Sequence, residues 1–475
     1  MINNFELVIG IEIHIELNTK TKCFSPVSND FNGPINQLVS PIDLGYPGTL
    51  PLLNQAVVIK AIKLAKALNM EIDHELHFDR KNYYYTDLPK GFQITQQFRP
   101  IGKNGILELD LDGFEKKIEI ERIHIEEDTA RQLHQNDATF INYNRAGVPL
   151  IEIVSKPQIS SAQEATKYVD TIRQIVQILN ISDAKMAEGS LRADVNLSTR
   201  LRGDQNYGTR VEIKNLNSLN NIKKAIEFES QLQIKKIINN EIINQETKRF
   251  DEATNQTVAI REKTDAIDYR YFPEPNLPVI KLDPNFVKDI KIETLPKAIK
   301  AHFQAYQVSS EYIEQIINNP DYLTFLNAVN HPDVAEIVKI FFAEIVPLIK
   351  KDNLDLKDLN INPKHFHDLI NIFKEGVISG KQLKLVIPKL ANLTISVDQL
   401  LEQMKLKLIS DENVIIEWIE SVKAKNPNLL NDYQNKPEAT TKFVVGEIMK
   451  LSKGQANPIL SVKLVNKLLG ENEKK

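Results

Sequence analysis

The chain has 475 residues, of which 42% are hydrophobic and 26% are charged, and its formal net charge is -4. This composition is that of an ordinary globular protein with room for two to four domains, and it excludes a chain that is basic throughout, although one domain can still carry a basic patch. The single cysteine, Cys23, excludes an internal disulfide and a four-cysteine zinc site, and it fits a reducing cytosol. We find no apolar run of about 18 residues and no leader pattern at the start, so we expect no membrane span.

The first 280 or so residues mix strand and helix patterns. In Phe5–Leu17, apolar residues occupy one parity and Glu6, Gly10, Glu12, His14 and Glu16 occupy the other, which predicts a strand with one apolar and one polar face. Apolar spacing of the helical kind predicts helices, and short aliphatic runs predict strands. The predicted helices are Asn54–Leu68, Ala162–Leu179 and Asn221–Ile238, and the further strands are Ile118–Ile125, Val148–Val154 and Val211–Lys214.

A proline-rich segment, Tyr271–Pro278, ends this mixed region. The pattern then becomes helical, and Pro296 suits a first helical position because its missing N–H is not needed there. Ser410-Asp411 is typical of an N-cap region that opens a new unit. We therefore predict an α+β domain followed by two all-helical domains, with residues 1–294, 295–409 and 410–475 as their bounds.

Three ionisable side chains share the polar face of the first strand. Glu12, His14 and Glu16 follow one another at roughly 6.5–7 Å on that face. Taken alone, the strand favours a solvated face of an edge strand. The alternative is a divalent-cation site, because carboxylate oxygens and an imidazole nitrogen are metal ligands.

Two other carboxylate-bearing segments strengthen that alternative. Glu126, Glu127 and Asp128 follow His124-Ile125, where simple alternation sends Glu127 toward the core, so that Glu127 contributes only if the strand ends, bulges or lines an interior site. Glu152 lies among aliphatic residues in Val148–Val154, where an unpaired charge is costly. A surface glutamate on an edge strand is the plainer interpretation, and we favour a buried functional carboxylate.

Several polar loops combine charge with hydroxyl or amide groups. They are Asp79–Tyr85 with Lys90 beyond it, Glu188–Arg192, and Lys214–Ser218. Such groups can neutralise a nucleoside triphosphate near a metal, while an ordinary polar loop explains each one singly. The chain lacks a G-x-x-x-x-G-K-[ST] phosphate loop, an N-terminal cysteine and a Gly/Ser-rich amidase stretch, so ammonia for any amidation must come from another chain.

Taken together, these segments resemble the GatB family, which supplies the carboxylate-activating chains of glutamyl-/aspartyl-tRNA amidotransferases, over essentially the whole chain. The resemblance is carried by nine blocks in order: VIGIEIHIELNT (Val8–Thr19), DLGYPGTLP (Asp43–Pro51), FDRKNYYYTDLPK (Phe78–Lys90), HIEEDTAR (His124–Arg131), YNRAGVPLIEIVS (Tyr143–Ser155), EGSLRADVN (Glu188–Asn196), VEIKNLNS (Val211–Ser218), DYRYFPEP (Asp268–Pro275) and KGQANP (Lys453–Pro458).

The resemblance implies a glutamine-synthetase-like α+β "cradle" with an antiparallel sheet, a helical domain and a YqeY-like helical tail. It implies ATP-dependent phosphorylation of the side-chain carboxylate of Glu on tRNA(Gln) or of Asp on tRNA(Asn), followed by amidation with ammonia. It also implies a GatA-type amidase subunit as the source of that ammonia, a GatC-type small subunit, Mg²⁺ as cofactor, and a cytoplasmic location.

The resemblance also assigns residues by motif. It makes Glu12, His14, Glu127 and Glu152 the magnesium ligands, with the three glutamates counted as catalytic. Lys81, Tyr83 and Lys90 fall on the polar ammonia route beside the activation site, and both lysines are counted as catalytic. The nucleotide contacts that it suggests are Lys81, Tyr83, Glu188, Arg192, Lys214, Asn217 and Ser218. The tail is expected to touch the tRNA body, with Lys442, Lys450 and Lys453 as phosphate contacts.

Some positions depart from the family. Many relatives bind zinc through a cysteine cluster near the segment after Cys23, and its absence here predicts no zinc. Ala187, Ala193 and Asn276 replace residues that the family usually carries, which leaves the metal quartet unchanged. Two other functions stay open: a tRNA-docking subunit without chemistry of its own, and a stand-alone ligase acting on a free amino acid. The carboxylate cluster argues against the first, and the helical second half argues against the other.

Overall fold

The computed structural model describes residues 4–30, 32–111, 113–262, 268–406, 409, 411–452 and 454–470. They form two compact units, residues 1–298 and 299–475. The predicted division of the helical part at residue 410 stays a prediction, and both Ser410 and Lys453 lie outside the described residues. No helix in the described part of the chain is long and apolar enough to cross a membrane.

A nine-stranded sheet forms the centre of the first unit, with strand order β14-β13-β12-β11-β1-β10-β7-β6-β2. Neighbouring strands are antiparallel except β12 and β13, so the sheet is mixed where we expected an antiparallel one. The 20-residue helix α3 connects these two strands and supplies the crossover that parallel pairing requires. The strands are β1 (Phe5–Glu16), β2 (Glu71–Ile72), β6 (Gly102–Leu111), β7 (Phe114–Glu127), β10 (Pro149–Ser155), β11 (Leu191–Leu201), β12 (Val211–Leu216), β13 (Glu246–Asp251) and β14 (Gln256–Glu262).

Strand β1 is a central strand, paired with β11 on one side and β10 on the other. The interpretation of its polar face as part of an edge strand is therefore wrong, and Glu152 on β10 is likewise central, between β1 and β7. Ile9, Ile11, Ile13 and Ile15 are fully buried on the apolar face. The polar face of the sheet must then be occupied by something other than bulk solvent alone.

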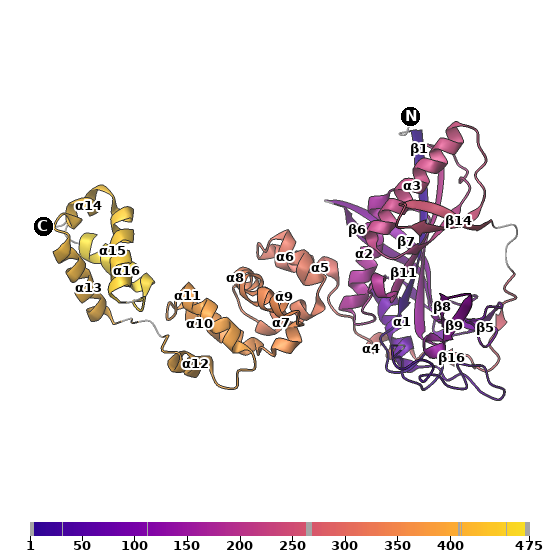
Figure 1. The fold of residues 1–475 in the computed structure, drawn as a ribbon, viewed down its shortest axis with the longest axis horizontal. Coiled ribbons are helices and arrows are strands. Elements are labelled where there is room, and N and C mark those ends of the chain that lie inside the picture. Colours follow the sequence, from indigo (N-terminus) through magenta and orange to yellow (C-terminus); the bar gives the residue numbers. More distant parts are fainter. Residues whose placement is uncertain are drawn as a thin grey trace. The chain divides into compact units, whose positions relative to one another are not determined.

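Three helices pack on the apolar face of the sheet (Figure 1). Helix α1 (Gln55–Ala67) begins at the cap residue Asn54, and α2 (Ala162–Ile178) begins at Ser161; both side chains accept a backbone N–H of the first turn, as the predicted starts require. Helix α3 (Leu219–Ile238) begins two residues before its predicted start, because Ser218 caps it by accepting the N–H of Asn221.

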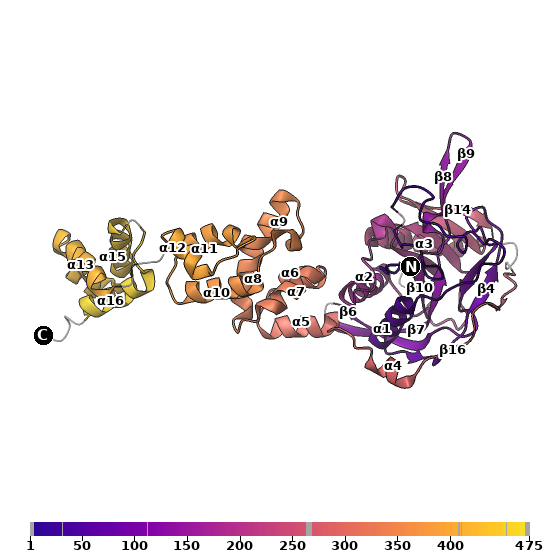
Figure 2. The ribbon, with the colours of Figure 1, turned by 90° about the horizontal axis from the view of Figure 1, so that it is seen from below.

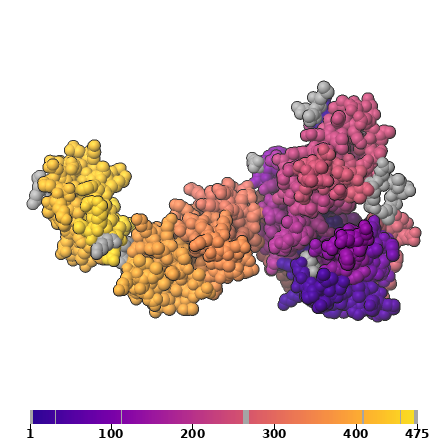
Figure 3. Space-filling model, in the orientation of Figure 1, coloured from indigo at the N-terminus to yellow at the C-terminus, as the bar shows by residue number. Residues whose placement is uncertain are grey.

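Smaller elements surround the sheet. The strands β4 (Asp79–Asn82), β5 (Phe92–Thr95) and β15 (Phe272–Pro273) form one small sheet, and β3 (Glu75–Leu76) pairs with β16 (Ile280–Lys281). The hairpin β8 (Arg131–Gln135) and β9 (Ala138–Asn142) projects from the first unit (Figure 2). In the space-filling view the unit is hollowed between its pink and purple surfaces (Figure 3). A short helix, α4 (Pro284–Asp289), and the start of α5 (Pro296–Ala305) complete it, with Pro296 at the first helical position as expected.

The second unit is helical. Its helical segments after α5 are α6 (Ser310–Ile317), α7 (Pro320–Val329), α8 (Val334–Ile340), a π-helical stretch (Phe341–Ile345), α9 (Val346–Asp352), α10 (Pro363–Lys374), α11 (Gly380–Val386), α12 (Val397–Gln403), α13 (Glu412–Lys425), α14 (Leu429–Asn435), α15 (Pro437–Leu451) and α16 (Pro458–Gly470), with 3₁₀ turns at Leu356–Leu359 and Ile387–Leu390. Asp411 caps α13 through the N–H groups of Asn413 and Val414. Helices α13–α16 share an apolar core of their own.

Candidate functional site

A row of polar side chains crosses the four central strands of the sheet. His14 on β1 lies opposite Arg192 on β11 and Glu152 on β10, and Glu152 lies opposite His124 on β7. Residues directly opposite each other in a sheet project from the same face, so all four side chains reach the polar face together. The register of the strands, and not the loops, therefore brings these groups to one place.

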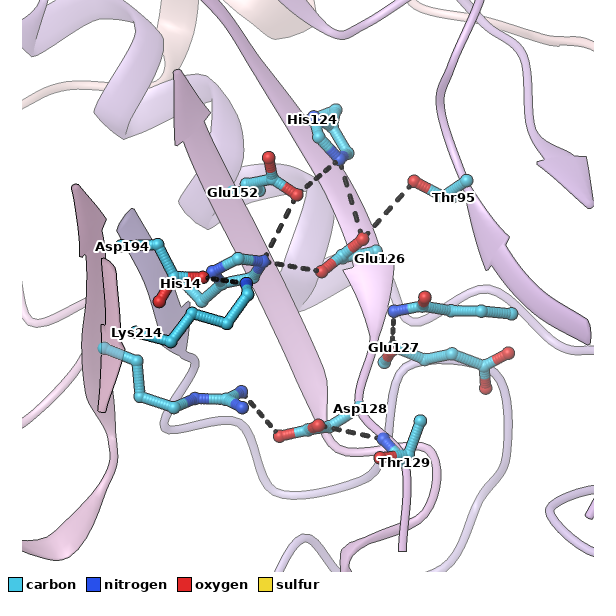
Figure 4. Close-up of polar contacts among 12 residues, drawn as sticks. His14, Thr95, His124, Glu126, Glu127, Asp128, Thr129, Glu152, Asp194 and Lys214 are labelled. Carbon is cyan, nitrogen blue, oxygen red and sulfur yellow. Dashed lines mark hydrogen bonds and ion pairs between the residues drawn. The ribbon is translucent and has the colours of Figure 1, made fainter. Parts of the chain in front are cut away.

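Two imidazoles and two carboxylates meet at the centre of this face (Figure 4). Glu152 Oε2 lies 3.2 Å from Nε2 of His14 and 3.3 Å from Nε2 of His124, while Glu126 Oε1 and Oε2 lie 3.6 Å from those two nitrogens. One ligand atom from each of His14, Glu126 and Glu152 lies within 4.8 Å of the other two. This spacing is compatible with three ligands of a single cation.

The electrostatics of the cluster follow from its burial. Burial by itself raises the pKa of the Glu152 carboxyl, but His124 and His14 hold that pKa well below its usual range. Burial lowers the pKa of His124, and Glu152 and Glu126 overcome this and raise it to about 9. The two carboxylates thus demand compensating positive charge, which two protonated imidazoles or one divalent cation can supply.

Glu12 belongs to a neighbouring acidic group on the same face. Its ligand atoms lie within 4.8 Å of those of Asp194 on β11 and Glu212 on β12. The ammonium of Lys214 lies 2.6 Å from Asp194 Oδ2 and 3.0 Å from Glu212 Oε1, and Asn196 donates to Glu12 at 2.9 Å. Burial first, and then Glu152 and Asp194, raise the pKa of the Glu12 carboxyl. Glu12 and His14 are therefore adjacent on the face but stand in two different clusters.

Glu127 projects from the opposite side of β7. Its carboxylate accepts from the ammonium of Lys90 and from the N–H of Ile94 at 3.0 Å, and both Glu127 and its lysine partner are nearly buried. Alternation along β7 thus holds to the end of the strand, with Glu126 on the polar face and Glu127 turned away from it. Of the four ligands that the resemblance assigns, the structure brings His14 and Glu152 together, with Glu12 nearby and Glu127 engaged elsewhere.

Lys81 and Tyr83 lie on and just after β4, beside the carboxylate cluster. Burial lowers the pKa of Lys81, but the charges of Glu126 and other acidic groups raise it overall, which places its ammonium within their field. The Lys81 ammonium also lies 4.9 Å from the ring centre of Tyr269. Both residues line a cavity of about 650 Å³ together with further tyrosines, which are Tyr84, Tyr85 and Tyr269. The ammonia-route residues Lys81 and Tyr83 are therefore neighbours, and the Lys90–Glu127 pair is a separate contact.

A second cavity, of about 520 Å³, opens at the Glu16 end of the polar face. Its lining includes four of the residues expected to contact a nucleotide, Glu188, Arg192, Asn217 and Ser218, together with Glu16, Arg131, Arg145, Met186, Ala187, Gly189, Asn221 and Glu252. Asn217, Ser218 and Asn221 mark the N-terminus of α3, an end at which N–H groups favour anions. Lys214, the remaining lysine of that expectation, is held by Asp194 and Glu212 instead.

Arginines line the inner wall of this cavity. Arg145 lies 2.8 Å from Glu16 Oε1 and 2.7 Å from Asp128 Oδ2, and Arg192 lies 2.8 Å from the same Asp128 oxygen. Burial raises the pKa of Glu16 to about 7 although Arg145 opposes this shift. Nε of Arg192 is buried and has no hydrogen-bond partner among the described residues. The wall is thus rich in guanidinium groups, as a site for a polyanion requires.

Sequence reasoning missed four residues of the site: His124, Glu126, Asp194 and Glu212. The signal was present for three of them, because His124 and Glu126 share one parity and Asp194 shares the parity of Arg192 and Asn196. That signal gives a site only when the strand partners are known, since the polar faces of β1, β7, β10 and β11 must coincide. Lys442 and Lys450 are exposed on α15, and Lys450 pairs with Glu447 one turn earlier.

Comparison with known proteins agrees with this arrangement. Residues 7–288 match the family model of the GatB/GatE catalytic domain, and residues 323–469 match the model of the GatB domain. The chain is 51% identical over 472 residues to the second (B) chain of the aspartyl/glutamyl-tRNA(Asn/Gln) amidotransferase of Mycoplasmopsis agalactiae, covering 99% of this chain and 100% of that protein. The proteins of the same name from Mycoplasma mobile and Mesoplasma florum are 53% and 43% identical, over 100% and 98% of this chain and 100% and 98% of their own lengths. The chain therefore belongs to the GatB family.

Proposed function

We propose that this chain is the subunit of a tRNA-dependent amidotransferase that activates the side-chain carboxylate of Glu on tRNA(Gln), of Asp on tRNA(Asn), or of both. The observation that carries this proposal is the buried cluster of His14, Glu126 and Glu152 on a sheet face that also opens into an arginine-lined cavity. A subunit that only docks tRNA has no need for buried carboxylates that converge on one point.

The donor set fits a divalent cation such as Mg²⁺. His14, Glu126 and Glu152 would hold it, with the acidic group at Glu12 beside them, and the two anionic oxygens within reach match the preference of hard cations. When bound, the cation offsets the charge of the phosphates and of the attacking carboxylate. The proposed cofactor is magnesium. The absence of zinc stays a prediction.

The cavity beside Arg145 and Arg192 suits the phosphates of ATP. The arginines of its wall and the N-terminus of α3 offer donors to the phosphate oxygens, while the neighbouring carboxylate cluster marks the point where the γ-phosphoryl group is transferred. In that transfer an oxygen of the substrate carboxylate bonds to phosphorus and ADP leaves, which gives an acyl phosphate. A carboxylate is a poor electrophile, and the acyl phosphate carries a good leaving group.

Amidation needs ammonia and therefore a second chain. Ammonia attacks the activated carbonyl carbon, phosphate leaves, and the nitrogen loses a proton to give the amide. We propose that a GatA-type amidase supplies the ammonia, that a GatC-type subunit joins the two chains, and that the complex works in the cytoplasm. The Lys81 and Tyr83 side of the cluster is the proposed side of ammonia entry, with Lys90 and Glu127 near it. A closed route keeps ammonia unprotonated and away from water.

The test uses the assembled complex with Glu-tRNA(Gln) and ATP, without an amide donor. Hydroxylamine traps the acyl phosphate as a hydroxamate, and we expect hydroxamate to form with the wild-type chain. Glu152→Ala should abolish hydroxamate and amide formation while binding of the charged tRNA survives. Glu119→Ala, on the exposed part of β7, is the matched control and should retain activity. Full amidation by Glu152→Ala would contradict the assignment of the activation site.

A further inference from the structure

A third cavity, of about 290 Å³, lies on the polar face of the sheet at the other end of β1. Val8, Gly10 and Glu12 of β1 and Asn196 and Ser198 of β11 line it, together with the β11–β12 loop. In the register of these strands Gly10 lies opposite Asn196 and Val8 opposite Ser198, so the cavity continues the row pattern that begins at the His14 cluster. Glu12 forms its boundary toward that cluster.

The two cavities lie on opposite sides of the carboxylate cluster along one strand face. The arginine-lined cavity begins at Glu16, and the third cavity begins at Glu12 and extends to Val8. Phosphoryl transfer places the attacking and the leaving oxygen roughly in line on opposite sides of phosphorus. If the nucleotide enters from the Glu16 side, the attacking carboxylate must arrive from the side of Gly10.

We propose that the third cavity and the β11–β12 loop, residues 202–210, receive the aminoacylated terminal nucleoside of the tRNA. This inference rests on the proposed function and adds the site of its second substrate. Gly10 lies two residues from Glu12, about 7 Å along the strand, which is a span of the order of an extended glutamyl side chain. The ribose and base of the terminal nucleoside then lie at the mouth of the cavity, next to the loop.

The loop has the composition of a site for a single-stranded nucleotide. Tyr207 lines the cavity and is 66% exposed, and the guanidinium of Arg200 lies 5.2 Å from its ring centre. Arg210 is exposed at the same cavity. Unpaired bases stack on aromatic rings and on guanidinium planes, and arginines contact the phosphates of the strand. An exposed tyrosine between two arginines thus provides a stacking surface with positive charge around it.

The position of this tyrosine is fixed by the residue that follows it. A Cβ at Gly208 would lie 2.1 Å from the carbonyl oxygen of Thr199 on β11, so no side chain fits between the loop and the strand. The close approach of the backbones holds the loop back against β11, beside the cavity. Tyr207 therefore has a defined place at the cavity mouth.

The experiment measures steady-state amidation by the full complex with charged tRNA and ATP varied in turn. We expect Tyr207→Ala to raise the KM for the charged tRNA by about 5- to 150-fold, the range of one lost base stack, and to leave the KM for ATP unchanged. Tyr207→Phe keeps the ring and should restore the KM. Phe114→Ala, on an aromatic residue that is also 66% exposed, is the matched control.

A second measurement places the nucleoside directly. A charged tRNA with a photoreactive terminal adenosine should crosslink to residues 202–210, and a crosslink to the Tyr83–Tyr85 segment instead would overturn the inference. So would an unchanged KM in Tyr207→Ala when the wild-type complex forms hydroxamate. If the wild-type complex forms no hydroxamate with charged tRNA and ATP, the proposed function itself fails, and the two failures are thereby distinguished.

Discussion

The first unit buries ionised side chains in many places, whereas the second unit encloses mainly aliphatic and aromatic ones. Among the described residues, every aspartate, glutamate and lysine classed as buried lies within residues 1–298. The buried polar residues of the second unit are His331, Thr440, Thr441, Ser452, Asn457 and Ser461. Taking a charge out of water costs several kcal/mol, roughly, before its partners compensate it, so the first unit carries a cost that the second avoids.

Buried charge by itself does not mark the site. Glu229 on α3 is fully buried, yet it accepts from Lys248 at 3.1 Å and from Thr257 at 2.5 Å, and this compensated group fastens α3 to β13 and β14. At the polar face the balance differs, because Glu12, Asp194 and Glu212 share Lys214 and the pair Glu126 and Glu152 is compensated only by imidazoles and by nearby Lys81. The difference teaches that an excess of converging carboxylates, and not burial, separates a cation site from a structural ion pair.

The largest expected effect compares two adjacent residues on opposite faces of β7. Glu126→Gln removes an anionic ligand from the His14 cluster, so we expect hydroxamate formation to fall by about 10²–10³-fold, as for other lost electrostatic contacts to a reacting group. Binding of Mn²⁺, followed by its electron paramagnetic resonance signal, should weaken in parallel. Glu127→Gln should keep Mn²⁺ binding, because its carboxylate faces Lys90.

The outcome decides between the geometry and the motif. If Glu127→Gln loses Mn²⁺ and Glu126→Gln retains it, the ligand set drawn from this structure is wrong and the set drawn from the resemblance is right. A wild-type chain that binds no Mn²⁺ would remove the cation site altogether. Circular dichroism of both variants checks that the sheet is intact.

The sequence predicts much of the first unit because local signals agree with the tertiary fold. The period-2 pattern of β1, the caps Asn54 and Ser161 and the proline at 296 each act within a few residues. The clustering of Glu126 with Glu152 depends instead on which strands are neighbours, a long-range property that no local pattern contains. The same limit explains why β1 suggested an edge strand, since its polar face is that of a strand lining a site.

The second prediction moves to the helical unit and is smaller. Lys442 and Lys450 are exposed on α15, and a single phosphate contact adds only part of the salt-dependent affinity for a nucleic acid. We expect Lys442→Ala to raise the KM for charged tRNA by roughly 2- to 5-fold, to lessen its dependence on salt, and to leave kcat unchanged, in steady-state assays at two salt concentrations. Lys339→Ala, an exposed lysine on α8, is the control. An equal response to salt in Lys442→Ala and wild type would remove this lysine from tRNA binding.

The smallest effect concerns a partly buried cation on α1, away from the carboxylate cluster. Burial, reinforced by Lys63, lowers the pKa of Lys60 to about 8, while its ammonium donates to Asn18 and Asn180. Between about pH 8 and the ordinary lysine pKa near 10.5, the unfolded chain binds more protons at this position than the folded chain, so stability rises with pH there.

We therefore expect the thermal midpoint of the wild-type chain to rise relative to that of Lys60→Met as the pH increases from 8 to 10. The midpoint difference isolates Lys60 because the other groups that titrate in this range are shared by both chains. About half of the side chain is exposed and solvent screens its charge, so the change should be a few degrees at most. Lys63→Met controls for the loss of one positive charge on α1. A wild-type midpoint that falls relative to Lys60→Met over this range would show that burial at this position favours the charged form, and the contrast between the units would then not extend to partly exposed lysines.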